Sequence, residues 1–162
     1  MENKRKVVLG LGNLLQKDAG FGMRVVQALE VEMGRELRRD QVELVDGGTL
    51  GAGLLPLVEN CSHLLVLGAV ESQAKPGTLV ELSKKQIPQF VGLKLSQQQV
   101  SFQEVLELAG RRGNLPEHVY LIGIQPCDLG SGQELSQEVE RKLPRAILRA
   151  VEVLREWEVV NF

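Results

Sequence analysis

Short apolar runs alternate with amphipathic stretches along this chain, and this alternation restricts the folds open to it. The first run, at residues 7–11, is followed by glycines and polar residues. Apolar residues then recur at helical spacing from Phe21 to about Leu37. A strand, a turn and an amphipathic helix in that order are typical of βαβ proteins. We therefore expect an α/β fold with a largely parallel sheet.

The same reasoning places the other elements. A continuous apolar run at residues 64–67 indicates a strand buried on both faces, and therefore a central one. Residues 78–82 follow Pro76 and Gly77, which favours an edge or antiparallel strand. Further strands are expected at residues 42–45 and 119–124, and helices at 50–58, 96–109 (with Ser96 as N-cap) and 135–157, the last interrupted at Pro144.

Size and charge exclude several classes of protein. The chain has 162 residues, 43% of them hydrophobic, which fits one domain over residues 1–162. Its formal net charge of −2 lacks the broad basic field of a non-specific nucleic-acid binder, so we expect no nucleic acid as partner. No apolar stretch approaches the roughly 20 residues of a membrane span. We expect a cytoplasmic protein that does not bind a membrane; its oligomeric state stays open.

The cysteines and histidines give little sign of a metal site. Cys61 and Cys127 are too far apart in sequence for a close metal-binding pair, and a reducing compartment disfavours a disulfide. We expect both to be structural or incidental. His63 and His118 each precede an expected strand, so we expect their rings to be satisfied by the backbone or by solvent.

A glycine-rich turn follows the first expected strand. Gly10 and Gly12 resemble the start of a dinucleotide-binding G-x-G-x-x-G motif, but Leu15 stands where the third glycine belongs. The glycines are therefore interpreted as shaping a tight turn rather than a dinucleotide site. Because ligands of open α/β sheets bind at the carboxyl ends of the strands, we expect Asn13, Asp46 and Glu71 near one rim.

Several segments, in order, resemble the hydrogenase maturation endopeptidases, which trim the C-terminal extension of a nickel–iron hydrogenase large subunit. They are LGLGNLLQKDAGFGMRVVQAL, VELVDGGTLG, LLVLGAVESQAKPGT, LSQQQVSFQEVL and IGIQP followed by LSQEVE. The resemblance covers nearly the whole chain. It implies a single-domain three-layer sandwich: a twisted, mostly parallel five-stranded sheet with helices on both faces.

The resemblance also implies three metal ligands, and this chain departs from the pattern at each of them. Ala19 stands where the family has the second of two adjacent acidic residues, although Asp18, Gly20 and Gly22 are retained. Gly68 stands in place of an aspartate, and Gln98 in place of a histidine. Alanine and glycine offer no side-chain donor, and a lone amide is a weak ligand for nickel. We therefore expect no bound metal or other cofactor.

Two retained features still predict a substrate-binding cleft. The segment Asp46, Gly47, Gly48 and Thr49 corresponds to the family's specificity segment, and its glycines permit a positive-φ turn. Asp46 is a tentative catalytic residue, but it or Thr49 could equally cap the next helix. The cleft is expected to comprise Asn13, Asp18, Asp46, Gly47, Gly48, Thr49, Glu71 and Gln98. Asp18 or Glu71 remains open as a compensating ligand.

Three hypotheses about function follow. The favoured one is a diverged, non-proteolytic binding or assembly factor for a hydrogenase large subunit or its maturation machinery. The second is an active endopeptidase that removes the C-terminal extension without the usual nickel ligation, so enzymatic activity stays open. The third is a metal-independent α/β domain with another ligand.

Overall fold

The structure is a computed structural model that describes residues 5–38, 40–48, 53–87 and 102–160. Its strands are β1 (Arg5–Leu11), β2 (Val42–Gly48), β3 (Cys61–Ala69), β4 (Leu79–Ser83) and β5 (His118–Ile124). Its helices are the 3-10 helix η1 (Lys17–Gly20), α1 (Phe21–Met33), α2 (Leu54–Glu59), α3 (Phe102–Arg111), α4 (Gln137–Glu140) and α5 (Leu143–Glu156).

The five strands form one sheet in the order β2-β1-β3-β5-β4. Strands β2, β1, β3 and β5 are parallel, and β4 pairs antiparallel with β5 at one edge. The expectations of a central third strand and of an antiparallel edge strand are thus confirmed. The order changes direction between β1 and β3, which is where ligands bind in open α/β sheets.

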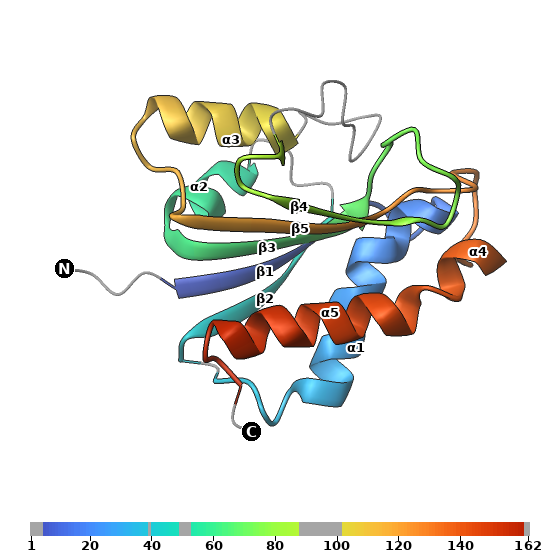
Figure 1. Cartoon of the computed structure of the whole chain (residues 1–162), viewed down its shortest axis with the longest axis horizontal. Helices are drawn as coiled ribbons and strands as arrows, with labels where there is room; N and C mark the ends of the chain where they lie inside the picture. The colour runs from blue at the N-terminus through green and yellow to red at the C-terminus, as the bar shows by residue number, and fades with distance from the viewer. Residues whose placement is uncertain (1–4, 39, 49–52, 88–101, 161–162) are drawn as a thin grey trace.

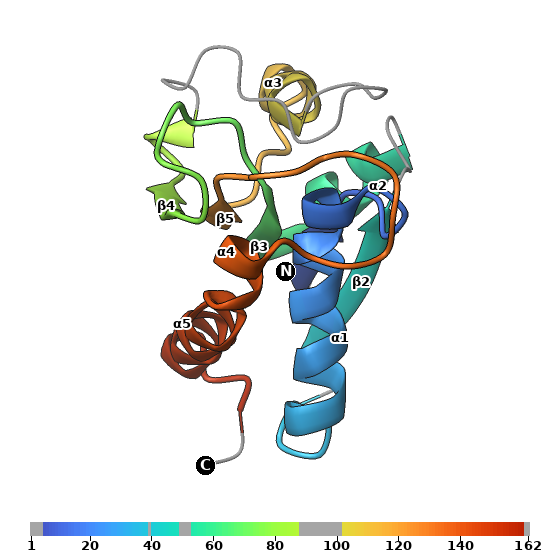
Figure 2. The same cartoon turned by 90° about the vertical axis from the view of Figure 1, so that its right-hand side faces the viewer.

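Helices cover both faces of the sheet, as the alternation predicted (Figures 1 and 2). Helices α1 and α5 pack on one face, against residues such as Val8, Leu65 and Ile122. Helices α2 and α3 pack on the other face, against Val7 and Leu64. Neighbouring residues of one strand point to opposite faces, so each buried strand contributes to both cores.

Two glycines let the first helix lie directly on the strand ends. A side chain on Gly22 would place its Cβ 2.0 Å from the carbonyl oxygen of Leu67 in β3. Gly12 has φ of +127°, and a Cβ there would lie 1.7 Å from the carbonyl oxygen of Ala19. Only glycine fits both places, so the turn after β1 lies closely against η1 and the start of α1 lies directly on β3.

One expected helix end needs correction, and the prolines of two other helices behave as their positions allow. The helix expected to reach Leu37 ends at Met33, because a turn follows it. The expected interruption of the closing helix at Pro144 is confirmed, because α4 and α5 are separate helices and Pro144 stands in the first turn of α5, where its missing N–H is harmless. Pro56 lies in the first turn of α2, which explains why it does not break the helix. The expected cap Ser96 lies outside the described residues.

No helix in the described ranges is long and apolar enough to cross a membrane.

Candidate functional site

The carboxyl ends of the parallel strands form one rim of the molecule. Asn13 follows β1, Asp46 lies near the end of β2, and Glu71 follows β3. The parallel register aligns Gly10 with both Asp46 and Leu67, so these three strand ends lie side by side. The topology therefore places Asn13, Asp46 and Glu71 at the same edge of the sheet.

The glycine pair after Asp46 forms a bulge in β2. Asp46 pairs with Gly10, but the next pair is Gly48 with Leu11, which leaves Gly47 as an extra residue. Gly47 is buried, and a Cβ on it would lie 2.6 Å from the Cδ1 of Leu9. Gly48 has a φ of +39°, as the expected positive-φ turn requires. Gly47 and Gly48 therefore allow the tight packing and the backbone conformation of this turn.

Asp46 is exposed at this bulge and accepts no hydrogen bond from the part of the chain that the structure describes. It does not cap the next helix, because the N-cap of α2 is Gly53 and no side chain bonds to that helix start. The alternative of Asp46 as a cap is thus wrong. Thr49 lies outside the described residues.

Ala19 lies in η1 and Gly68 lies in β3, and these two elements contact each other. Ala19 is 7% exposed, and its carbonyl accepts a hydrogen bond from the backbone N–H of Asn13 at 3.1 Å. Gly68 is buried in β3 opposite Gly123 of β5. Neither position supplies a side-chain ligand atom. Gln98 lies outside the described residues.

The carboxylate of Asp18 is fully buried and turned towards the loop at residues 125–136. Its Oδ2 accepts the backbone N–H groups of Cys127 at 2.8 Å and Asp128 at 2.9 Å, and the hydroxyl of Ser136 at 2.8 Å. Its Oδ1 accepts the N–H of Ser136 at 2.7 Å. With four donors already bound, this carboxylate is a poor candidate for a compensating ligand.

Further contacts tie the same loop to the turn at residues 15–18. The N–H of Lys17 bonds to the carbonyl of Gly132 at 2.9 Å, and the N–H of Gly132 bonds to the carbonyl of Leu15 at 2.9 Å. The Nζ of Lys17 lies 2.9 Å from the carboxylate of Asp128, which raises the pKa of Lys17. In Figure 2 the loop passes across the start of α1. The turn at residues 15–18 and the loop at residues 125–136 are therefore joined by hydrogen bonds beside the strand ends.

Gln125 is a site residue that the sequence did not reveal. Its side chain is 4% exposed and lies directly after β5. Its Nε2 donates to the carboxylate of Glu71 at 3.0 Å, and its Oε1 accepts the N–H and the hydroxyl of Ser72 at 2.7 and 2.9 Å. Gln125 therefore positions Glu71 at the rim. Its location in the IGIQP segment was the only sequence signal.

The described residues offer no other strong reactive group at this rim. A hydrogen bond to Glu138 is the first cause that raises the pKa of the Cys127 thiol, so this cysteine is a poor thiolate nucleophile. Both cysteines are free thiols, Cys61 buried and Cys127 exposed. Within the described ranges, no three His, Cys, Asp or Glu side chains are grouped so that they could hold a metal ion.

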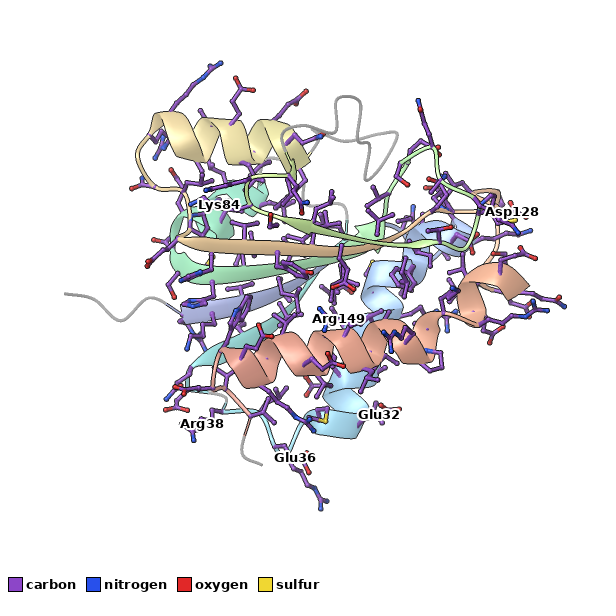
Figure 3. All side chains as sticks on the ribbon, in the orientation of Figure 1. Glu32, Glu36, Arg38, Lys84, Asp128 and Arg149 are labelled. Atoms are coloured by element: carbon purple, nitrogen blue, oxygen red, sulfur yellow. The ribbon has the colours of Figure 1, made fainter. Side chains whose placement is uncertain are left out.

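A cavity of about 510 Å³ opens at the other end of the sheet, lined in part by Lys84, His118 and Trp157. Figure 3 shows Lys84 and Asp128 at opposite ends of the molecule. There the ring of His63 stacks on His118 with 4.3 Å between centroids, and its Nδ1 lies 2.8 Å from the hydroxyl of Ser62. These histidines are far from the carboxyl rim, so they contribute no side chain to it.

Comparison with known proteins gives a consistent result. A family model described as hydrogenase maturation protease (HycI) matches residues 23–153. The hydrogenase expression/formation protein HupD of Rhizobium leguminosarum bv. viciae is 42% identical over 157 residues, which cover 96% of this chain and 76% of that protein. The hydrogenase 2 maturation protease of Escherichia coli is 35% identical over 153 residues, which cover 94% and 92% of the two chains.

Solved structures of similar proteins have the same fold as this chain. The hydrogenase maturating endopeptidase HybD from E. coli superposes with a TM-score of 0.83 at 34% identity, covering 94% of this chain and 93% of that one. The solution structure of an endopeptidase from E. coli gives a TM-score of 0.86, also at 34% identity, with 96% and 95% covered. The sheet and its flanking helices are those of this group of proteins.

Proposed function

Because this chain belongs to the hydrogenase maturation protease family, we propose that it takes part in the maturation of a nickel–iron hydrogenase in the cytoplasm. Its role is that of a non-proteolytic binding or assembly factor for the hydrogenase large subunit. One single-domain unit over residues 1–162 carries this role. The proposal rests on one observation: among the described residues the rim keeps its backbone architecture, but Ala19 and Gly68 carry no metal-binding side chain and no three His, Cys, Asp or Glu side chains are grouped to hold a metal ion.

The preserved backbone supports a retained cleft. The turn at Gly12 and the bulge at Gly47 each bring main chain into contact that only glycine permits. These features hold the strand ends in a fixed arrangement.

The side chains at the family's ligand positions do not fit a nickel ion. A first-row divalent metal binds through imidazole, thiolate or carboxylate, and neither Ala19 nor Gly68 carries such a group. Asp18 is engaged by the loop at 125–136, and Glu71 is bound on one side by Gln125. If these positions are where the metal of the substrate is recognised in the family, this chain senses nickel differently or not at all.

Asp46 alone does not supply a complete peptidase site. Amide hydrolysis needs a group that activates water and a group that stabilises the developing oxyanion, tasks that a metal or a positioned donor performs. Asp46 offers one exposed carboxylate, and no partner base lies against it among the described residues. Binding without cleavage is the simpler expectation.

Cleavage of a nickel-loaded large-subunit precursor tests the proposal directly. The precursor from the organism that carries this gene is incubated with this protein, and the mass of the large subunit is followed. In parallel, the E. coli hydrogenase 2 maturation protease with its own precursor serves as positive control. We expect a stable complex and an unchanged mass. A shortened large subunit would establish the alternative, an active endopeptidase, and absence of any complex would remove the proposed role.

A back-substituted variant tests the vacant ligand positions. Ala19→Glu, Gly68→Asp and Gln98→His together should create divalent-metal affinity that the parent lacks. Gly68 lies inside β3 and is not one of the glycines with a positive φ, so its replacement needs no left-handed conformation. Calorimetric titration with Ni²⁺ compares the variant with the parent. Equal heats in the two proteins would argue against a preserved cleft.

A further inference from the structure

We propose that the outer edge of β2 binds the C-terminal extension of the hydrogenase large subunit as an additional strand of the sheet. This inference rests on the proposed function and adds to it the place and the mode of binding. The edge consists of the main chain of residues 42–46, which leads to Asp46 at the carboxyl rim.

The hydrogen bonds between β1 and β2 show which main-chain groups of β2 face outwards. Within the described residues β2 is the last strand on its side of the sheet and pairs with β1 alone (Figure 2). The N–H of Lys6 in β1 bonds to the carbonyl of Gln41 at 2.9 Å, so Gln41 faces β1. Every second residue after Gln41 also faces β1, and the residues between them point away. The N–H and C=O groups of Leu44 and Asp46 are therefore directed outwards.

These outward groups form a short open edge. The N–H of Val42 bonds to the carbonyl of Arg38 at 2.9 Å, which closes the edge on that side, and the bulge at Gly47 closes it on the other. Between them, the main chain of Leu44 and Asp46 has no hydrogen-bond partner in the part of the chain that the structure describes. Residues 42–46 contain neither proline nor lysine, which protect many edge strands from pairing.

The opposite edge of the sheet, at β4, is less open. The N–H of Ser83 is already bound by the side-chain Oε1 of Gln86 at 2.9 Å. Strand β4 also runs antiparallel to its neighbour β5, so its carboxyl end lies away from the rim. A chain paired with β2, by contrast, lies beside Asp46, the tentative catalytic residue.

The chemistry of the β2 edge fits the main chain of an extended polypeptide. Outward N–H and C=O groups that repeat every second residue, about 7 Å apart, are matched by another strand whatever its side chains. A free chain end can add as a strand without unfolding the subunit that carries it, which favours the C-terminal extension over an internal segment. Paired with Leu44 and Asp46, the extension reaches the rim next to the exposed carboxylate of Asp46.

Hydrogen–deuterium exchange resolved by residue tests the edge directly. The free protein is compared with its complex with the large-subunit precursor. The amides of Leu44 and Asp46 should exchange rapidly in the free protein and roughly tenfold or more slower in the complex. The amides of Glu43 and Val45 face β1 and should be protected in both states. Exchange at Leu44 and Asp46 that the bound precursor leaves unchanged would overturn the inference.

A proline variant removes one outward N–H. Leu44→Pro deletes a group that β1 does not use, so the pairing of β1 with β2 is kept. Leu44→Ala is the first control, because it loses the same packing but keeps the N–H. Leu79→Pro is the second, because Leu79 starts the other edge strand and packs partly buried on the same core as Leu44. Urea unfolding verifies that all three variants are folded.

We expect Leu44→Pro to weaken binding of the precursor roughly fivefold or more, and both controls to change it less than about twofold. Equal binding by Leu44→Pro and Leu44→Ala would count against strand addition at β2. Protection of Leu44 and Asp46 in the free protein that disappears on dilution would assign the edge to a second copy of this chain instead.

Methylation of the peptide gives a test that does not depend on the folding of a variant. Synthetic peptides of the C-terminal extension, each N-methylated at one residue, compete with the precursor for this protein. Binding should fall roughly fivefold or more at every second residue and less than about twofold at the residues between. No competition by the unmethylated peptide, or losses without this alternation, would refute the inference while the proposed function stands. If the precursor itself does not bind, both fail.

Discussion

Ser136 binds the carboxylate of Asp18 twice, through its backbone N–H at 2.7 Å and through its hydroxyl at 2.8 Å. The two residues are 118 positions apart in the sequence. Their contact closes the loop after β5 over the turn after β1. It joins two segments that are distant in sequence at the rim where the candidate site lies.

Asp18→Ala should destabilise the protein by about 3 kcal/mol, because it leaves several buried donors without an acceptor. The control Ser136→Ala removes one of the four hydrogen bonds and should cost about 1 kcal/mol. Urea unfolding at pH 7 measures both. A loss of less than about 1 kcal/mol for Asp18→Ala would mean that water replaces the carboxylate without penalty.

The role of Asp18 also shows where sequence reasoning stops. Its place next to Ala19 made it a candidate ligand, since adjacent residues share a neighbourhood. In a 3-10 turn, however, neighbouring side chains point in different directions, and that of Asp18 points away to the loop at 125–136. Only the tertiary contact decides between the two directions.

The strands were predictable for a physical reason. Runs such as 64–67 are apolar because both faces of a central parallel strand are covered, and β3 is indeed central. The bulge at Gly47 was not predictable, because two adjacent glycines fit many turns. The link between Gln125 and Glu71 was hidden for a different reason: it is a tertiary contact between residues 54 positions apart.

The contact of Arg149 on α5 with Glu81 on β4 should make the free energy of unfolding depend on pH in the acid range. Arg149 is labelled in Figure 3. Arg149 donates to both carboxylate oxygens at 2.7 to 3.0 Å, and Tyr120 donates at 2.7 Å. The hydrogen bonds from Arg149 are the first cause that lowers the pKa of Glu81 from 4.5. Its contribution is therefore complete above pH 4.5 and is lost as pH falls through the lower, folded-state pKa.

Glu81→Gln should destabilise the protein by about 2 kcal/mol at pH 7, because a charged hydrogen-bond acceptor is lost. The difference between wild type and variant should shrink as the pH falls below 4.5, and urea unfolding at pH 7 and pH 3.5 measures it. The control is Glu107→Gln, whose carboxylate pairs with Arg111 at the exposed surface and should contribute little. A difference for Glu81→Gln that is the same at both pH values would contradict the assignment.

His63 should lower the stability of the folded protein in mild acid. Burial first, and then the charges of His118 and Lys6, lower the pKa of His63 from 6.5 to about 4. The unfolded chain therefore takes up a proton below pH 6.5 that the folded chain takes up only near pH 4. Stability should fall as the pH decreases through this window.

His63→Phe should remove that dependence. Because the ring is partly exposed, we expect the wild type to lose only about 1 kcal/mol more than the variant between pH 7 and pH 5. Parallel thermal or urea unfolding at the two pH values measures the difference. NMR titration of the wild type should also show the His63 ring still neutral at pH 5, and a midpoint near 6.5 would refute the prediction.

Two glycine-to-alanine changes should have opposite effects on stability. In Gly22→Ala the new Cβ would meet the carbonyl oxygen of Leu67 at 2.0 Å, and a backbone atom of a central strand cannot move aside easily. We expect a loss of at least about 2 kcal/mol. Gly110 lies in α3 with nothing within 4 Å of a Cβ, so Gly110→Ala should stabilise the protein by roughly 0.5–1 kcal/mol.

The pair separates the close approach of α1 to β3 from the general effect of replacing glycine. Both variants lose the same conformational freedom in the unfolded state, so a difference between them comes from the folded state. Urea unfolding of both proteins measures it. If Gly22→Ala were as stable as Gly110→Ala, α1 would have to lie farther from β3 than the structure places it. The main-chain geometry on which the proposed cleft depends would then be wrong as well.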